Sequence, residues 1–165
     1  MEDDLISIFL NAAENGHTDS LTTLIAEGAD VNIKNNEEIT ALMCAAKNGH
    51  TDTVALLIDK GADVNVGNSV GATALMKAAE KGHTDTVALL IDKGADVNIK
   101  THKYGWTTLM RAAKGSHTDT VALLIKHGAD IDAKEVTNGN TALMMAAYDG
   151  DTRNSNNANK ERGRC

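Results

Sequence analysis

Proline is absent from this 165-residue chain, and aromatic residues make up only 2% of it. Without proline, slow cis–trans isomerisation cannot limit folding. Compact cores usually draw much of their buried area from aromatic side chains. A chain this poor in them must instead bury Ala, Leu, Ile, Val and Met in many small layers. Its length is that of one domain with room for a tail.

Paired cysteines and long apolar runs are missing as well. Cys44 and Cys165 are far apart and form no Cys-x-x-Cys motif, so neither a disulfide framework nor a thiolate metal site is predicted. No apolar stretch is long enough to predict a membrane span, and the acidic first four residues are unlike a secretory signal. We therefore expect a cytoplasmic protein without membrane contact, with export as a host-directed effector left open.

Basic residues are outnumbered by acidic ones, and the formal net charge is −7. The last fourteen residues contribute +3, so the rest of the chain carries about −10. Binding to a phosphate backbone depends on Lys and Arg. An acidic body therefore argues against nucleic acid as a partner.

What the chain does contain is internal repetition, the signature of repeat proteins. Gly-His-Thr-Asp-Thr-Val-Ala-Leu-Leu-Ile occurs at Gly49 and Gly82, and with serine replacing the glycine at Ser116. The tripeptide Gly-Ala-Asp recurs at intervals of 33, 33 and 34 residues, starting at Gly28, Gly61, Gly94 and Gly128. Thr-Ala-Leu-Met or Thr-Thr-Leu-Met opens a unit at Thr40, Thr73, Thr107 and Thr141.

Each unit is predicted to form two short antiparallel helices. The opening threonine can cap the first helix by accepting a hydrogen bond from a first-turn amide, and the Ala-Ala pair that follows favours helix. Gly49 and Gly82 supply the positive φ that ends that helix. Val54, Leu57 and Ile58 form the apolar stripe of the second helix. Because one pair cannot bury its apolar face alone, neighbouring units must stack.

Thr-Ala-Leu-Met-x-Ala-Ala-x-x-Gly-His and Leu-Leu-Ile-x-x-Gly-Ala-Asp-Val-Asn resemble the ankyrin repeat, from Asp4 to about Thr152. The resemblance implies an all-α solenoid of about five repeats, the last incomplete, with short hairpin-like loops between repeats. Glu38 stands where a hairpin glycine is usual, and Ser116 should cost about 1 kcal/mol relative to glycine in its turn. Ala and Met replace the family's Pro and His after the capping threonine, the methionines being Met43, Met76, Met110 and Met144.

The resemblance divides the chain into a repeat domain over residues 1–152 and a polar tail over 153–165, which we expect to be disordered. We hypothesise that the tail is a frameshifted helix, because back-translation read one base later can give Glu-Ile-Val-Thr-Met-Leu-Ile-Lys-Lys-Gly-Ala-Asp-Val. Unit one should be a cap with Phe9 in its core. Unit five lacks a second helix, so Leu143 and Met144 should be poorly covered. The expected repeats span about 4–33, 34–67, 68–100, 101–133 and, in part, 134–152.

Side chains that could carry chemistry recur once per repeat. Histidines in neighbouring units lie about one helix diameter apart, too far to share a zinc ion at about 2 Å. We expect them to hydrogen-bond within the inter-helix turn, and the Asp and Asn of Ala-Asp-Val-Asn to make turns. Nothing near Cys44 in the sequence predicts an activated thiol. These histidines are His17, His50, His83 and His117.

No catalytic, cofactor or metal motif is found, so we expect neither an enzyme nor a bound cofactor or metal. In some animal ankyrin proteins the matching asparagine is a hydroxylation target. Asn32, Asn65 and Asn98 resemble such acceptors.

Ankyrin proteins usually meet a partner with their concave face, which consists of the hairpin tips and the exposed side of each first helix. The only Trp and both Tyr fall on this face, and Tyr, Trp and Arg often dominate binding energy. In the alternative interpretation, Trp106 only covers its own hairpin or the neighbouring repeat. The predicted partner-binding residues are Ile39, Cys44, Val70, Lys77, Glu80, Tyr104, Trp106, Arg111, Lys114 and Tyr148.

The sequence thus predicts a monomeric protein–protein interaction module whose protein partner is unidentified. The alternative is an engineered or spacer scaffold without a dedicated partner. An acidic chain favours an acidic concave side and a partner with basic features, although Lys47, Lys77 and Arg111 fall on that side.

Overall fold

The computed structural model describes residues 2–148. The end of the expected fifth unit, 149–152, and the tail at 153–165 lie outside them, together with the disorder and frameshift predictions. The helices are α1 (Glu2–Glu14), α2 (Thr18–Ala26), α3 (Ala41–Lys47), α4 (Thr51–Asp59), α5 (Ala74–Lys81), α6 (Thr84–Asp92), α7 (Thr108–Lys114) and α8 (Thr118–Lys126), with a further helix over 142–148.

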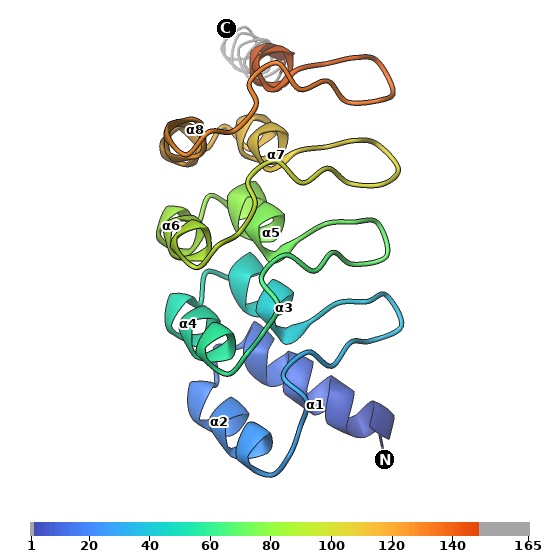
Figure 1. The fold of residues 1–165 in the computed structure, drawn as a ribbon, viewed down its shortest axis with the longest axis vertical. Coiled ribbons are helices and arrows are strands. Elements are labelled where there is room, and N and C mark those ends of the chain that lie inside the picture. Colours follow the sequence, from blue (N-terminus) through green and yellow to red (C-terminus); the bar gives the residue numbers. More distant parts are fainter. Residues whose placement is uncertain (1, 149–165) are drawn as a thin grey trace, which may run out of the picture.

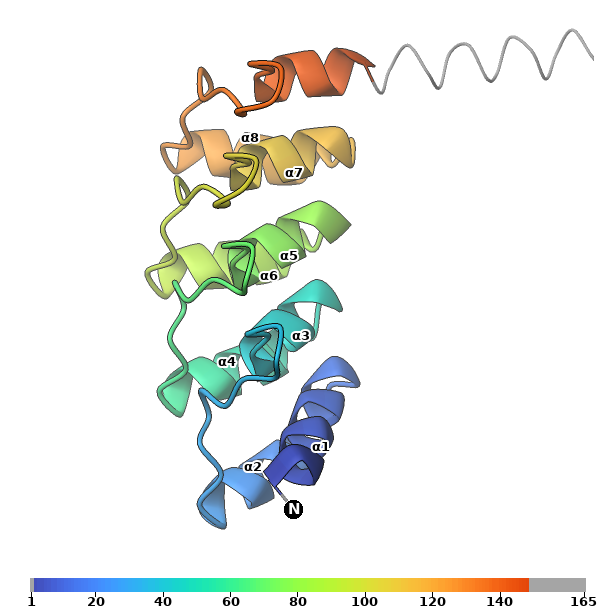
Figure 2. The same cartoon turned by 90° about the vertical axis from the view of Figure 1, so that its right-hand side faces the viewer.

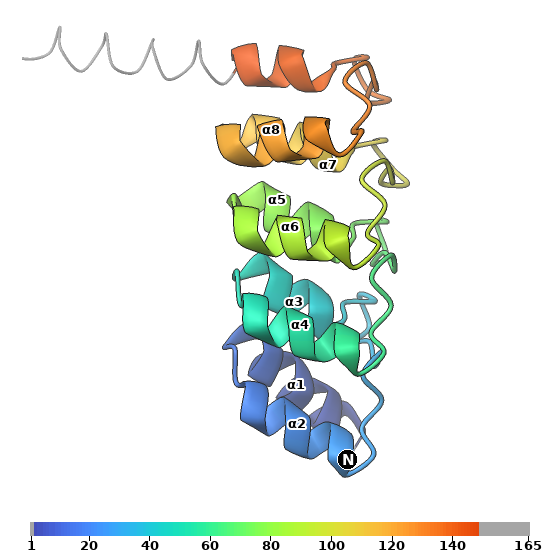
Figure 3. The ribbon, with the colours of Figure 1, turned by 60° about the vertical axis from the view of Figure 1, so that its left-hand side comes forward.

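The helices stack in layers along one long axis. In Figure 1, α2, α4, α6 and α8 form one column, α1, α3, α5 and α7 form the middle column, and hairpin-like loops form the third. Figure 2 views the stack from the side of the loops, and Figure 3 brings the column of second helices forward. Each first helix packs on the first helices of adjacent layers and on its own second helix. The predicted all-α repeat solenoid is confirmed.

The capping threonines start the first helices as predicted. The Thr40 hydroxyl accepts a hydrogen bond from the Met43 amide at 3.3 Å. The same bond joins Thr107 to Met110 and Thr141 to Met144, at 3.3 and 3.4 Å. These caps satisfy amides that have no partner inside the helix.

The turns that follow the first helices use left-handed backbone. Gly49 and Gly82 have φ values of 71° and 72°, as predicted. Ser116 takes the same conformation at 57°, and so does Glu38 in the hairpin of the second unit. Both side chains therefore occupy positions that favour glycine.

One hydrophobic cluster runs through the stack from Phe9 in α1 to Ala142 in the last helix. Each layer contributes a few small side chains, such as Leu42, Val54 and Leu57, which are almost fully buried. Phe9 is completely buried in the first layer, so its predicted place in the core is confirmed. Burial is thus continuous although no single layer has a large core.

The repeated histidines join neighbouring units, and the prediction that they bond within their own turn is wrong. The Nε2 of His50 donates to the Glu14 carbonyl at 2.9 Å, 36 residues back. His83 donates to the Lys47 carbonyl at 3.1 Å in the same way. Stacking places each imidazole against the turn below, where a Cβ on Gly49 would approach the His83 ring to 2.6 Å. Glycine is required there for space as well as for its φ.

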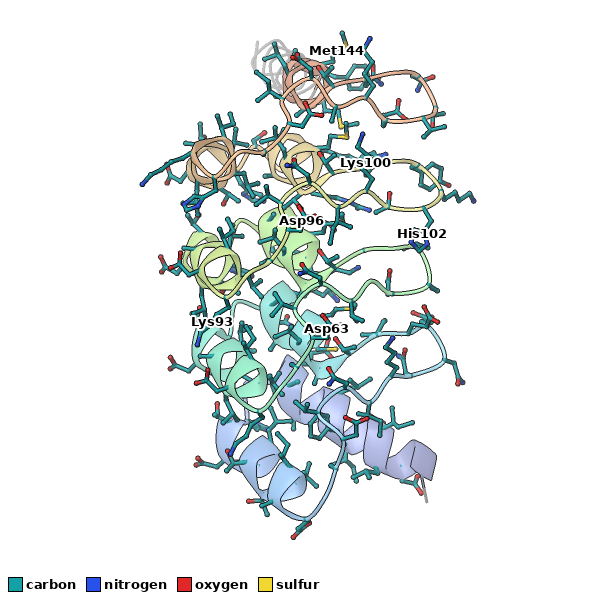
Figure 4. All side chains as sticks on the ribbon, viewed as in Figure 1. Asp63, Lys93, Asp96, Lys100, His102 and Met144 are labelled. Carbon is teal, nitrogen blue, oxygen red and sulfur yellow. The ribbon has the colours of Figure 1, made fainter. Side chains whose placement is uncertain are left out.

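The repeated asparagines and threonines add two more sets of bonds between units. Asn65 donates to the Gly94 carbonyl at 3.1 Å and accepts from the Asp96 amide at 2.8 Å. The predicted turn is also present, because Asp63 accepts from the Asn65 amide at 3.0 Å. In Figure 4, Asp63 and Asp96 occupy matching places in successive layers. The paired hydroxyls are Thr18 with Thr53, Thr51 with Thr86 and Thr84 with Thr120, 2.8 to 3.0 Å apart.

The C-terminal layer presents apolar side chains. Leu143 and Met144, predicted to be poorly covered, are 78% and 54% exposed, and Figure 4 shows Met144 on the outermost helix. An apolar groove of about 450 Å³ lies between this helix and the α7–α8 layer, lined partly by Leu109, Val121 and Ile125. It lies beside α8, where a further second helix would pack.

Candidate functional site

Each hairpin loop is built around one acceptor side chain near its start. In the second unit, Asn35 accepts from the amides of Glu37 and Ile39, both at 3.0 Å. Asn68 plays the same part in the third unit. In the fourth, the Thr101 hydroxyl accepts from the Trp106 amide at 2.9 Å. These bonds lie within a single hairpin loop, so each loop is stabilised by its own residues as well as by contacts with adjacent repeats.

Glu135 holds the fifth hairpin, a role that the sequence reasoning missed. Its carboxylate accepts from the amides of Thr137 at 2.6 Å, Asn138 at 2.7 Å and Asn140 at 3.3 Å. Burial raises the pKa of Glu135, but these amide bonds together outweigh burial and bring the pKa below its usual value. The available signal was position, because Glu135 stands in unit five where Asn68 stands in unit three.

The hairpins are tied to one another by backbone bonds at their tips. The Ser69 amide donates to the Glu37 carbonyl at 3.1 Å, and the His102 amide to the Val70 carbonyl at 3.0 Å. The Val136 amide donates to the Tyr104 carbonyl at 2.9 Å. Figure 4 shows His102 at this column of tips. The tips therefore form one connected edge, on which the side chains of Val70 and Tyr104 are nearly half exposed.

Trp106 is the centre of a cluster on the fourth unit. The Arg111 guanidinium lies 4.8 Å from the centroid of its ring, and the Lys114 ammonium lies 4.9 Å from it. Both distances fit cation–π contacts. Arg111 also reaches Glu80 of the preceding unit at 3.4 Å. Four of the predicted residues are thus brought together, while Tyr104 faces Lys103 at the hairpin tip, 5.1 Å from ring centroid to ammonium.

A groove of about 480 Å³ brings together three other predicted residues, Ile39, Cys44 and Lys77. It lies between α1 and α3. Burial, with a smaller contribution from the charge of Glu14, raises the pKa of the Cys44 thiol to about 11. Lys47 and Lys77 act in the opposite direction, so the expectation that nothing nearby lowers this pKa is wrong in part. Burial outweighs them, and the thiol stays protonated at neutral pH.

The helices α3, α5 and α7 differ in charge from the second helices, and the expectation of an acidic concave side is wrong for these three, although α1 in the same column carries four acidic residues. Together they carry five cations and one carboxylate. Helices α2, α4, α6 and α8 carry six aspartates and one lysine. Net charge sums both columns and therefore hides this difference. The charged residues of α3, α5 and α7 are Lys47, Lys77, Lys81, Arg111, Lys114 and Glu80.

The last predicted residue, Tyr148, lies apart from both groups. It is 76% exposed on the final helix. Among residues 2–148, no three His, Cys, Asp or Glu side chains are placed to share a metal ion. None of the helices within that range is long and apolar enough to cross a membrane.

Comparison with known families decides the classification. A family model described as ankyrin repeats (3 copies) matches residues 9–101 and again residues 99–157. The chain belongs to the ankyrin-repeat family. No curated protein matches the chain. Ankyrin repeats are in general protein–protein interaction modules, and the family is typically non-enzymatic.

Proposed function

We propose that this ankyrin-repeat protein binds a protein partner through its concave face, which consists of the hairpin tips and the exposed sides of α3, α5 and α7. The observation that supports this most is the cluster in which Arg111 and Lys114 both lie over the ring of Trp106. Trp and Arg are the residue types most often found at the energetic centre of interfaces.

The way the face is built also supports binding. Backbone bonds between hairpin tips and histidine bonds between turns hold the units in register. A surface that is already ordered loses little conformational freedom when a partner docks. Val70 and Tyr104 then offer exposed side chains on adjacent tips.

Affinity capture compares three proteins in a lysate of the cells that make this chain. They are the native protein, a variant with Tyr104, Trp106 and Arg111 changed to alanine, and a control with Asp52, Asp85 and Asp119 on the second helices changed to alanine. We expect a partner retained by the native and control proteins and lost by the first variant, as quantified by mass spectrometry. Equal capture by all three would contradict the proposed face. A native protein that retains nothing would favour the scaffold alternative.

We also propose that the chain acts as a monomer in the cytoplasm. The fold contains Cys44 as a free thiol, which suits a reducing compartment.

A further inference from the structure

Three lysines on the concave face are not engaged by carboxylates. In the part of the chain that the structure describes, the ion pairs join Lys93 to Asp59 and Arg111 to Glu80. The Lys93 pair belongs to the second helices, as Figure 4 shows for Lys93. Lys47, Lys77 and Lys114 form no ion pair within residues 2–148.

Arg111 is itself only partly engaged. Its Nη1 lies 3.4 Å from Glu80, whereas a strong charge-assisted bond is about 2.7–2.9 Å long. Its Nε is buried and has no hydrogen-bond partner among the described residues. Stacking on Trp106 holds the guanidinium in place without satisfying its donors.

These cations lie on three successive first helices at two matching positions of the repeat, Lys77 with Arg111 and Lys47 with Lys114, and Glu80 occupies the second of these positions in α5. Lys47 ends α3, Lys77 lies in α5, and Arg111 and Lys114 lie in α7. The three helices pack side by side in that order. We call Lys47, Lys77, Arg111 and Lys114 the cationic strip. Apolar contact is available at both ends of the strip, from the ring of Trp106 at one and from the Ile39–Cys44 groove at the other.

We propose that the cationic strip binds an acidic peptide segment, rich in Asp and Glu, of the partner protein. This inference rests on the proposed function of the concave face and specifies the chemistry of the partner. Carboxylates spaced along an extended segment can meet cations on successive units, and apolar residues between them can contact Trp106 and the groove. Glu14 of α1 lines the same groove as Lys47 and Lys77, and its carboxylate limits the segment to α3, α5 and α7.

An acidic protein segment fits better than a nucleic acid. The second helices and the turns beside them carry the aspartates, and their field repels a long polyanion. A short peptide can stay within the strip, whereas a phosphate backbone carries charge along its whole length.

The test uses the fluorescence of Trp106, which is the only tryptophan in the chain and lies within the proposed site. The full chain is titrated with a twelve-residue peptide of Asp, Glu, Leu and Gly, at low and at physiological salt. Its control is the same peptide with Asn and Gln in place of the acids. We expect a saturable change in emission with the acidic peptide only. The affinity for this peptide should fall by about tenfold or more at the higher salt.

Two double variants separate local charge from net charge. Lys77→Glu with Lys114→Glu should weaken binding by about tenfold or more, because it reverses two cations of the strip. Lys60→Glu with Lys126→Glu changes net charge equally, but places the changes at the ends of α4 and α8. That variant should bind within about twofold of the native protein. Circular dichroism establishes whether both double variants are folded. If one is not, the Arg111→Lys variant is titrated in its place, and its affinity for the acidic peptide should fall several-fold.

Several outcomes would overturn the inference. They are an unchanged emission, equal weakening by both double variants, or tighter binding of a single-stranded oligonucleotide than of the acidic peptide. If capture still depends on Tyr104, Trp106 and Arg111 while the acidic peptide fails, the concave face binds a partner of other chemistry. If capture does not depend on them, the proposed function itself fails.

Discussion

Ser116 occupies a backbone position that favours glycine, with φ at 57°. Removing its Cβ by Ser116→Gly should relieve the strain and stabilise the fold by about 1 kcal/mol. Urea denaturation followed by circular dichroism measures the change. Ser116→Ala is the matched control, because it removes the hydroxyl and keeps the Cβ. Equal effects of the two substitutions would show that backbone strain is not the cause.

Glu135 should make the fifth hairpin sensitive to acid. Its folded pKa is lowered, so its contribution is fully present above the unfolded value of about 4.3 and is lost as pH falls through the lower folded pKa. Thermal melts at several pH values should show the native protein more stable than Glu135→Gln near neutrality. The difference should shrink below about pH 4.3. A difference that is constant over the range would contradict the assigned role.

At the scale of elements, the fifth layer lacks a second helix among the described residues. Replacing residues 151–165 with a copy of residues 50–66 should cover the groove that Leu143 borders. Burial of the apolar lining should raise stability by about 2 kcal/mol or more. The control is the same copy with serine at the positions matching Val54, Leu57 and Ile58. A completed chain no more stable than this control would contradict the packing account.

The helices could be predicted from the sequence because their signals are local. Thr40 is followed three residues later by the amide that it caps, and Gly49 carries its own φ preference. The His83 bond could not be found in this way, since its acceptor, the Lys47 carbonyl, is 36 residues away and comes close only when units stack. Glu135 was missed because a carboxylate stands where the other units have an amide or a hydroxyl, so only its matching position in the repeat indicated that it accepts the loop amides.

The candidate site was predicted only in part, because some of its contacts are local in sequence and others form only when the repeats stack. The sequence placed Trp106 and Arg111 five residues apart, across a loop end and the first turns of α7, and the ring does contact the guanidinium. The pairing of Arg111 with Glu80 of the preceding unit required the stack. The charge of the face was within reach of the sequence, which placed Lys47, Lys77 and Arg111 on that side, but the net charge of the chain was given more weight than these positions.

For the molecule as a whole, the units form one body whose layers are joined by histidine, asparagine and threonine bonds. The connected tips and the cationic strip lie on one side of that body, and the aspartates of the second helices lie in the other column. Substitutions on the concave side of such a stack can therefore alter the affinity for a partner without unfolding the protein. This separation between stability and recognition is the central claim.

The most direct measurement of that claim is the affinity of the captured partner for Trp106→Ala, taken together with the melting temperature of the variant. We expect the dissociation constant to rise by about fivefold or more, which corresponds to about 1 kcal/mol, while the melting temperature changes little. An unchanged dissociation constant with a much lower melting temperature would contradict the account, because Trp106 would then serve only to cover its own hairpin.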